Sequence, residues 1–336
     1  MRNSVLLALC LFAAQATAQS YFIPDNVTTS GGCNVIPFGH NIAGTWSNQR
    51  YQSYVTPADI NNLPVAQICE LAFLPCVSGL RHFDTIEVVM AQTNTVPLSS
   101  TFSANLTANV QTVLKATNYD WTQTADTWTR IGLDRPFLYI AAQGSNIVIQ
   151  VTVTGAVLRT TSTSFPGHRT FARQRLYNYN WTGTPPLTAS GQDSSAAVKL
   201  EVILDSPDLN TFGTGCPGPS GTPTLSFTGS AKLGGNATID LSGALANTLT
   251  ALAIDVQRLE PAIDLTVVRA PGCSMYVRNV LTVFGVANGN GIQSLPVNIP
   301  TTGKCLRVYV QWFCRDSVAN PFGWTTSNYG RMLLGS

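Results

Sequence analysis

The feature that most constrains this 336-residue chain is a period-two alternation of apolar and polar side chains, which recurs at 147–154, 198–205 and 252–256. Successive side chains of a β-strand point to opposite faces, so each stretch predicts a half-buried strand. Helical spacing of apolar residues occurs only from Phe102 to Leu114, which permits either a short helix or an irregular crossover. The sequence therefore predicts an all-β fold.

Glycine and proline punctuate this pattern. The stretch SPDLNTFGTGCPGPSGTP, residues 206–223, lacks any periodicity and predicts a break between two β-sandwich domains. We expect a jelly-roll-like sandwich at 19–207, a linker at 208–222 and an Ig-like sandwich at 223–336. Within the second domain, the sequence Asn-Gly-Asn-Gly at 288–291 predicts a tight hairpin that joins strands at 280–286 and 292–299.

Residues 1–18 have the composition of a secretory signal peptide. Arg2 is followed by an apolar run and by the small residues Ala16, Thr17 and Ala18. The apolar run is shorter than the ~20 residues that a membrane helix needs. We therefore expect a secreted protein with no membrane insertion after cleavage.

Cysteine usage agrees with export. Removal of Cys10 with the leader leaves an odd number of cysteines, namely Cys33, Cys69, Cys76, Cys216, Cys273, Cys305 and Cys314. An oxidising compartment favours disulfides, and an odd count leaves one thiol unpaired within the chain. The first domain has three of these cysteines and the second has four, so we expect the unpaired thiol in the first domain. The segment Lys304 to Asp316 reads KCLRVYVQWFCRD. Its two cysteines, roughly 30 Å apart along an extended strand, cannot bond to each other.

Several pairings remain open. If the cysteines of the second domain all pair internally, Cys216 and Cys273 each bond one end of the 305–314 strand. The alternative is a Cys216–Cys273 bond with both strand cysteines reduced. In the first domain, Cys33 is expected to bond Cys69 or Cys76. Cys314 shares its face with the apolar residues of the strand, so we expect it to be buried.

Composition excludes several functions. The formal net charge is +2 and only 11% of residues are charged, so the chain has no broad basic face for nucleic acid. No motif predicts a metal site or a cofactor. His82 and Asp84 share a strand face, but no Gly-x-Ser-x-Gly nucleophile motif accompanies them. The acids available for glycoside hydrolysis are few: Asp84, Glu87, Asp120, Asp126 and Asp134.

Two adjoining groups of residues suggest ligand binding. In RLYNYNWTG the rings of Tyr177, Tyr179 and Trp181 fall on one strand face, where they would form a platform for a sugar ring. Just upstream stand His168, Arg169, Arg173 and Arg175, which would grip sulfate, phosphate or uronate. A second aromatic set is Tyr119, Trp121 and Trp128. The competing interpretation is that the rings face the core and that the arginines are solvated.

Two stretches of the first domain, LSSTFSANL at 98–106 and RPFLYIAAQGSNIVIQV at 135–151, resemble secreted bacterial β-sandwich proteins of the PEP-CTERM-associated type. FGTGCPGPSGTP, the PGC around Cys273 and the final NPFGWTTSNYGRMLLG resemble an Ig-like C-terminal module of exported envelope proteins. Ile140, Ala141 and Gln150 stand where that family often has Asp-Pro and Asp, so the resemblance implies no cation site. The sorting tail is absent, so we expect no retention by that route.

These observations favour a secreted, non-enzymatic extracellular or envelope protein with an adhesive or structural role. Its expected partners are polysaccharide, bound through the aromatic and arginine residues, or other envelope proteins. One alternative is a secreted polysaccharide-active hydrolase, which would need two carboxylates ~5 to 9 Å apart in an open cleft. Another is a self-assembling surface-layer or matrix component, which would need an exposed sheet edge or apolar patch.

Overall fold

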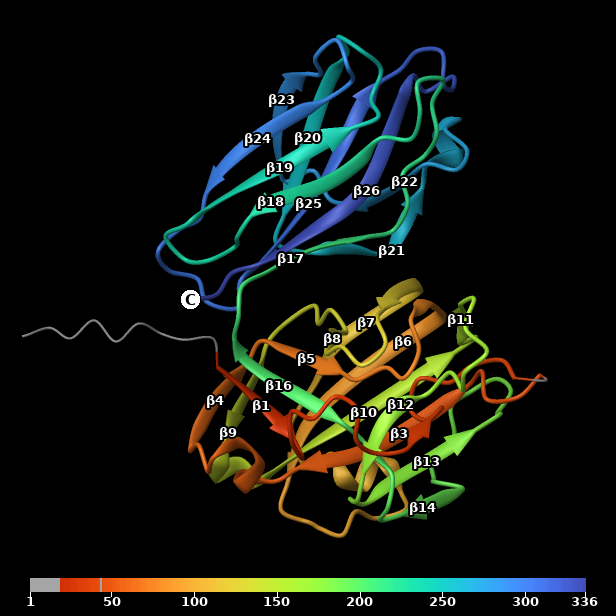
Figure 1. Cartoon of the computed structure of the whole chain (residues 1–336), viewed down its shortest axis with the longest axis vertical. Helices are drawn as coiled ribbons and strands as arrows, with labels where there is room; N and C mark the ends of the chain where they lie inside the picture. Colours follow the sequence, from red (N-terminus) through yellow and green to blue (C-terminus); the bar gives the residue numbers. More distant parts are fainter. Residues whose placement is uncertain (1–18, 43) are drawn as a thin grey trace, which may run out of the picture.

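The computed structural model describes residues 19–42 and 44–336, so the predicted signal peptide lies outside the described residues. The fold is all-β, as predicted, and its helical content among those residues is limited to short 3-10 turns. The sheets form two groups that follow one another along the chain, and each group encloses its own large apolar cluster (Figure 1). We call them the N-terminal sheets, residues 19–205, and the C-terminal sheets, residues 208–333.

Four sheets make up the N-terminal group. The largest has the strand order β11-β6-β10-β3-β13-β14, and β7 also pairs with β6. Its strands are β3 (Gln49–Val55), β6 (Gly79–Thr93), β7 (Ala108–Gln123), β10 (Asn146–Thr154), β11 (Val157–Arg159), β13 (Arg175–Tyr179) and β14 (Gly191–Asp193). A second sheet has the order β1-β16-β5-β8, with β1 (Gln19–Ile23), β5 (Glu70–Phe73), β8 (Thr129–Arg130) and β16 (Leu200–Asp205).

The smaller N-terminal sheets are β15-β12-β2 and the pair β4-β9. Their strands are β2 (Cys33–Asn34), β4 (Val65–Ile68), β9 (Phe137–Ile140), β12 (His168–Phe171) and β15 (Ala197–Val198). Three 3-10 turns connect these sheets: η1 (Pro57–Ile60), η2 (Phe102–Asn105) and η3 (Ala141–Gln143).

The C-terminal group has a five-stranded sheet, β17-β26-β25-β20-β23, and a three-stranded sheet, β18-β19-β24. Their strands are β17 (Asp208–Phe212), β18 (Thr224–Gly229), β19 (Asn236–Ser242), β20 (Leu249–Asp255), β23 (Leu281–Val286), β24 (Gln293–Asn298), β25 (Arg307–Arg315) and β26 (Trp324–Leu333). The pair β21 (Arg258–Asp264) and β22 (Ser274–Val277) and the turn η4 (Leu265–Val268) complete it.

Local predictions had mixed outcomes. The strand at 147–154 is β10, but it is buried on both faces rather than half-buried, because Leu98 and Phe102 cover its second face around Val148. The segment 102–114 contains no α-helix, since η2 is followed directly by β7. The segment predicted as an irregular linker, 208–222, begins with β17, which pairs with β26.

The predicted hairpin at 280–299 is wrong. The reversal itself forms, with the Asn288 N–H donating to the carbonyl of Ile292. However, β23 pairs with β20 in one sheet and β24 pairs with β19 in the other. The turn therefore connects the two layers, and Gly291 lies against the backbone of Ala244, where a side chain would not fit.

Disulfides link Cys33 to Cys76, Cys216 to Cys273 and Cys69 to Cys305. Cys33 pairs with one of its two predicted partners, and Cys305 and Cys314 do not bond to each other, as predicted. Two expectations are wrong. Cys305 precedes β25 and bonds Cys69 of the N-terminal sheets, so the second domain's cysteines do not all pair internally. The free thiol is Cys314, which is buried as expected but lies in the second half of the chain.

Candidate functional site

The predicted aromatic platform on β13 is a stack rather than an open surface. Tyr177 and Tyr179 stack with centroids 6.2 Å apart, and Tyr179 stacks on Trp46 at 4.3 Å. The guanidinium of Arg175 lies 4.9 Å from the centre of the Tyr177 ring. Because the rings cover one another's faces, little face area is left for a sugar on Tyr177 or Tyr179. Trp181, the third predicted ring, is buried.

The predicted arginine residues do not converge on one anion site. Each binds a different carboxylate: Arg169 pairs with Asp126 at 2.7 Å, Arg173 with Asp59 at 2.5 Å and Arg175 with Asp193 at 2.8 Å. These carboxylates come from three separate segments, so the charge of each guanidinium is already paired within the chain.

His168 lies in the core. Its ring stacks on Trp121 at 5.5 Å and packs 4.6 Å from Phe38, and its Nε2 lies 3.0 Å from the Gln123 amide. Burial first, and the nearby charge of Arg81 second, lower its pKa well below the usual range. A neutral histidine enclosed by aromatic rings has a structural role. In the second aromatic set, Tyr119 and Trp121 are buried, whereas Trp128 is half-buried and packs against Phe22 with ring centroids 5.2 Å apart.

His82 has a different partner from the one predicted. Its Nδ1 lies 2.8 Å from Asp120, whereas its Nε2 lies 3.6 Å from Asp84. Among residues 19–42 and 44–336, no hydrogen bond joins His82 to a serine, threonine or cysteine. The nucleophile of a hydrolase triad is therefore not in place.

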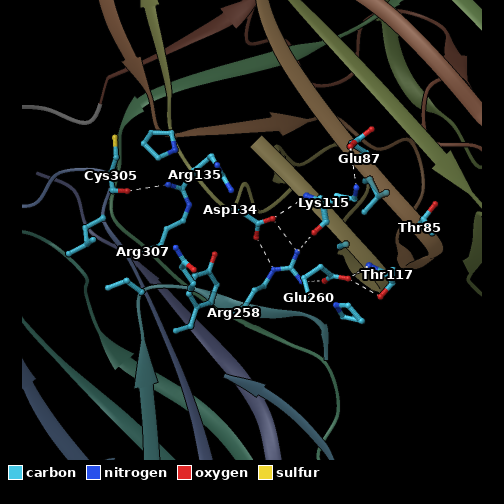
Figure 2. A pocket seen from close by; sticks show the side chains of 18 of the residues that line it. Thr85, Glu87, Lys115, Thr117, Asp134, Arg135, Arg258, Glu260, Cys305 and Arg307 are labelled. Carbon is cyan, nitrogen blue, oxygen red and sulfur yellow. Dashed lines mark hydrogen bonds and ion pairs between the residues drawn. The ribbon is translucent and has the colours of Figure 1, made fainter. Parts of the chain in front are cut away.

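A cleft of about 1060 Å³ lies between the N-terminal and C-terminal sheets (Figure 2). We define the cleft by its three sides. The floor is formed by β6, β7 and β10, one wall by residues 256–261, and the other wall by residues 134–136 and 303–307. Its apolar lining includes Pro136, Pro185, Val256 and Pro261.

Strand register builds the floor. Thr85 of β6 lies opposite Thr117 of β7 and Thr154 of β10. Two residues further along β6, Glu87 lies opposite Lys115 and Thr152. Side chains two apart on a strand point to one face, so these residues form two parallel polar rows. The cleft therefore presents hydroxyl, carboxylate and ammonium groups together.

Two of the three cleft carboxylates are fully engaged. Arg258 donates to Asp134 at 2.8 Å and also binds Glu260. The backbone N–H of Lys115 donates to Asp134, and Thr117 donates to Glu260 through its N–H and its hydroxyl. Burial alone would lower the pKa of Arg258, but surrounding groups that include Asp134 outweigh it and raise this pKa.

Glu87 is the exception among the cleft carboxylates. Its ion pair with Lys115 spans 3.8 Å, and both side chains are exposed to solvent. The end of the cleft beside Cys305 is cationic, because Arg135 and Arg307 meet there (Figure 2). The Arg307 guanidinium donates to the carbonyls of Leu133, Cys305 and Cys69. Burial lowers the pKa of Arg307.

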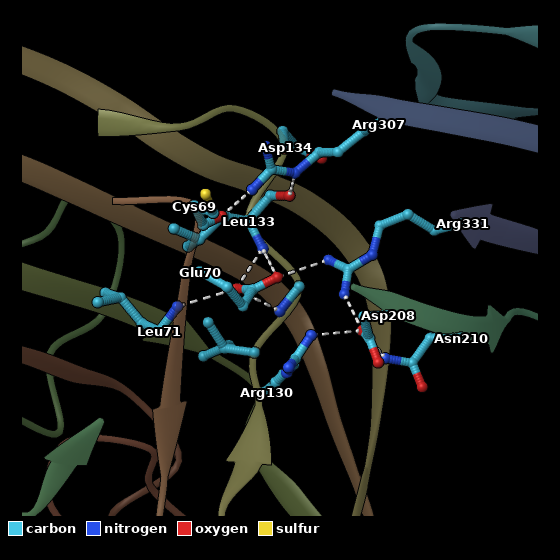
Figure 3. Close-up of polar contacts among 12 residues, drawn as sticks. Cys69, Glu70, Leu71, Arg130, Leu133, Asp134, Asp208, Asn210, Arg307 and Arg331 are labelled. Atoms are coloured by element: carbon cyan, nitrogen blue, oxygen red, sulfur yellow. Dashed lines mark hydrogen bonds and ion pairs between the residues drawn. The ribbon is translucent and has the colours of Figure 1, made fainter. Parts of the chain in front are cut away.

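A buried network next to the cleft joins the N-terminal sheets to the C-terminal sheets (Figure 3). Arg331 of β26 pairs with Glu70 of β5 at 2.9 Å, and both side chains are almost fully buried. Arg331 also binds Asp208 at 3.0 Å, and Asp208 lies 3.5 Å from Arg130. Burial alone would lower the pKa of Arg331, but Glu70 and Asp208 outweigh it and raise this pKa. The Cys69–Cys305 disulfide begins at the residue before Glu70, so a covalent bond and a charge network lie side by side.

Comparison with known proteins does not identify the chain. No protein-family model matches it, and no curated protein matches its sequence. Among solved structures, it is similar to a Bifidobacterium dentium β-glucuronidase in complex with coumarin-3-O-glucuronide, with 10% identity and a TM-score of 0.17, over 84% of this chain and 38% of that chain. A T=1 Penaeus vannamei nodavirus structure has 9% identity and a TM-score of 0.15, over 96% of this chain and 99% of that chain. Scores this low establish neither fold nor function.

Within the described ranges, no three His, Cys, Asp or Glu side chains gather as metal ligands. None of the helical segments described there has the length and hydropathy to span a membrane. Three disulfides indicate that the chain folds in an oxidising environment.

Sequence reasoning named Glu87 and Asp134 as candidate acids, but it missed Lys115, Arg258 and Glu260. Lys115 and Arg258 are far apart in the sequence, and the Arg258 guanidinium reaches the Lys115 carbonyl only because β21 packs beside β7. No short motif marks them, so only tertiary structure brings the cleft together.

Proposed function

We propose that this chain is a secreted, non-enzymatic extracellular or envelope protein with an adhesive or structural role, which binds polysaccharide in the cleft. The observation that carries the proposal is the chemistry of the cleft: two rows of hydroxyl and charged side chains face two proline-containing walls. Sugar hydroxyls both donate and accept hydrogen bonds, and this lining offers partners for both. The volume of about 1060 Å³ lies at the upper end of the ~300–1,000 Å³ of ligand sites, so a segment of a sugar polymer can enter the cleft.

The state of the carboxylates supports binding over hydrolysis. A glycosidase needs one carboxyl that can act as an acid and a second that acts as a base or nucleophile. Asp134 and Glu260 are both bound by Arg258 and by donors of β7, so their oxygens are already occupied by contacts within the chain. Of the three cleft carboxylates, Glu87 is the one that is exposed to solvent and not bound by Arg258. One such carboxylate cannot serve as both the acid and the base or nucleophile of a glycosidase.

Rigidity supports a binding role as well. The Cys69–Cys305 disulfide and the Glu70–Arg331 pair link the N-terminal sheets to the C-terminal sheets, and the Arg258–Asp134 pair joins the two walls of the cleft. In a preformed site, little binding free energy is lost to the ordering of side chains and loops when the ligand binds. The three disulfides also agree with an extracellular location, where such bonds persist.

Affinity electrophoresis of the full chain through gels that contain xylan, hydroxyethyl cellulose or alginate tests this proposal. We expect retardation by at least one polymer. We also expect a threefold or greater loss of affinity in Lys115→Ala and in Gln67→Ala, at a residue of β4 that also lines the cleft, because a typical hydrogen bond contributes about 1 kcal/mol. Lys232→Ala, an exposed lysine outside the cleft, is the matched control and should bind like the wild type.

Each other outcome counts against the proposal. Binding that is lost only in Tyr179→Ala would move the site to the stacked rings of β13. Absence of retardation in all three gels would remove polysaccharide binding. Release of reducing sugar that is abolished by Glu87→Gln would replace the proposal with hydrolase activity.

A further inference from the structure

A long uncharged segment forms one side of the C-terminal sheets. From Asn279 to Gly303 the chain carries no acidic or basic residue, and Arg278 and Lys304 flank this segment. The segment contains β23 and β24, which lie at the ends of their two sheets. The neighbouring labels β23 and β24 in Figure 1 mark this side of the C-terminal sheets, away from the N-terminal sheets.

The outer edge of β23 has no strand partner in the described chain. β23 pairs with β20 on one side only, in a continuous register from Leu281 to Val286. Every second N–H and C=O of an edge strand points outward, so β23 offers a ready template for another strand.

β23 and its flanks also expose an apolar strip. Val280 is 71% exposed, Leu281 57%, Phe284 68% and Val286 62%. Leu249, which lies opposite Val286 on β20, extends the strip. Phe284 and Val286 lie two residues apart, so they share the outer face of the sheet. A contiguous apolar strip along an unpaired edge marks an interaction surface.

Soluble proteins normally protect such edges with a charge, a proline or a bulge. Four other edge strands follow this rule: β11 contains Arg159, β14 contains Asp193, β17 contains Asp208 and β24 contains Pro296. β23 has none of these features, because its register is unbroken and its sequence is LTVFGV. The edge strand β18 (TLSFTG) lacks them too, but its large apolar residues Leu225 and Phe227 pack against the core, whereas those of β23 are exposed.

We propose that β23 pairs with β23 of a second copy of this chain, antiparallel about a two-fold axis, so that the two five-stranded sheets become one continuous sheet. Charge placement selects this occupant and this direction. In a parallel pair the two Arg278 side chains would lie about 5 Å apart, whereas antiparallel pairing separates them by roughly 35 Å. β23 carries no charge that could form an ion pair with a charged partner strand. Two copies of β23 place uncharged side chains against uncharged side chains, which gives the self-complementary surface that a two-fold contact requires.

The same geometry sets the strength of association. A six-residue ladder and one apolar strip bury less than the roughly 800 Å² per partner of a standard interface. The dimer is therefore a weak one, with a dissociation constant in the micromolar range, and it forms where the chain is concentrated. This inference concerns a surface other than the cleft and stands independently of polysaccharide binding.

Sedimentation velocity on the full chain, from about 1 to about 300 µM, tests the dimer. We expect the wild type to shift from monomer to dimer, and Phe284→Lys to remain monomeric, with an association at least 30-fold weaker. Leu187→Lys, at a residue that is 73% exposed in the N-terminal half, is the matched control and should dimerise like the wild type.

Hydrogen exchange on the wild type gives a readout that needs no variant. Amides of 281–286 should exchange more slowly at the highest concentration than at the lowest, while those of β14 should not change. A wild type that stays monomeric throughout, or a Phe284→Lys variant that dimerises like the wild type, would overturn the proposal. Protection confined to any other strand would do the same.

Discussion

The Glu70–Arg331 pair is the sharpest point at which to test how the two groups of sheets are joined. Glu70 accepts hydrogen bonds from the backbone N–H groups of Gly132, at 3.2 Å, and Leu133, at 2.9 Å, in addition to its ion pair with Arg331. Both charged side chains are excluded from water (Figure 3). Glu70→Ala therefore leaves one buried guanidinium with a single carboxylate partner, Asp208, and removes an acceptor from three buried backbone N–H groups, those of Leu71, Gly132 and Leu133.

The expected magnitude follows from these contacts. Removal of one member of a buried ion pair destabilises a protein by about 3–5 kcal/mol. The unpaired N–H groups of Gly132 and Leu133 place this substitution toward the upper end of that range. Glu87→Ala is the matched control, because it removes a carboxylate from an exposed pair with Lys115 and should cost less than about 1 kcal/mol.

Urea unfolding at pH 7, with the disulfides intact and tryptophan fluorescence as the signal, measures the difference. Glu70→Leu combined with Arg331→Met provides a further check, because replacing both charges with apolar side chains should recover most of the loss. If Glu70→Ala lowers the unfolding free energy no more than Glu87→Ala does, the network does not stabilise the junction and this reasoning is refuted.

Three further predictions concern the disulfides and the titratable groups. Cys69→Ser with Cys305→Ser should lower the thermal midpoint of unfolding more than loss of the Cys33–Cys76 bond does. The Cys69–Cys305 loop spans 236 residues and the Cys33–Cys76 loop 43, so the loss of chain entropy in the unfolded state gives stabilisations of about 5 and about 4 kcal/mol. Calorimetry that shows the reverse order would contradict this prediction. Burial raises the pKa of Cys314 to about 12, so its thiol should resist iodoacetamide at pH 8 until the chain unfolds. The contribution of this thiol to the free energy of unfolding should fall as pH rises from 9 to 12, because the unfolded chain ionises first. Labelling of the folded protein would count against this prediction. Burial alone would raise the pKa of Asp59, but Arg173 outweighs it and holds this pKa below 3.8, so the contribution is present above about pH 4 and lost on acidification. Asp59→Asn should narrow the gap between melting temperatures at pH 3 and pH 7, and an unchanged gap would exclude the pair as its source.

The sequence predicted the positions of strands better than it predicted which strands pair with each other. Alternation located β10, β16, β20 and β25 because side-chain direction depends only on neighbouring residues. It did not predict that β23 and β24 would join different layers, since an Asn-Gly turn fixes the reversal and not the sheet that each strand enters. The burial of His168 and the ion pairs of Arg169, Arg173 and Arg175 likewise depend on residues distant in the sequence.

The sequence by itself determined the class of fold and the odd number of cysteines that remain when residues 1–18 are set aside. Both are local properties, set by the period of the side chains and by composition. Tertiary structure alone decided that Cys305 bonds Cys69, that Glu70 binds Arg331, and that β6, β7 and β21 enclose the cleft. These contacts join residues up to 261 positions apart, and their partners are chosen by the packing of whole sheets rather than by any short stretch of chain.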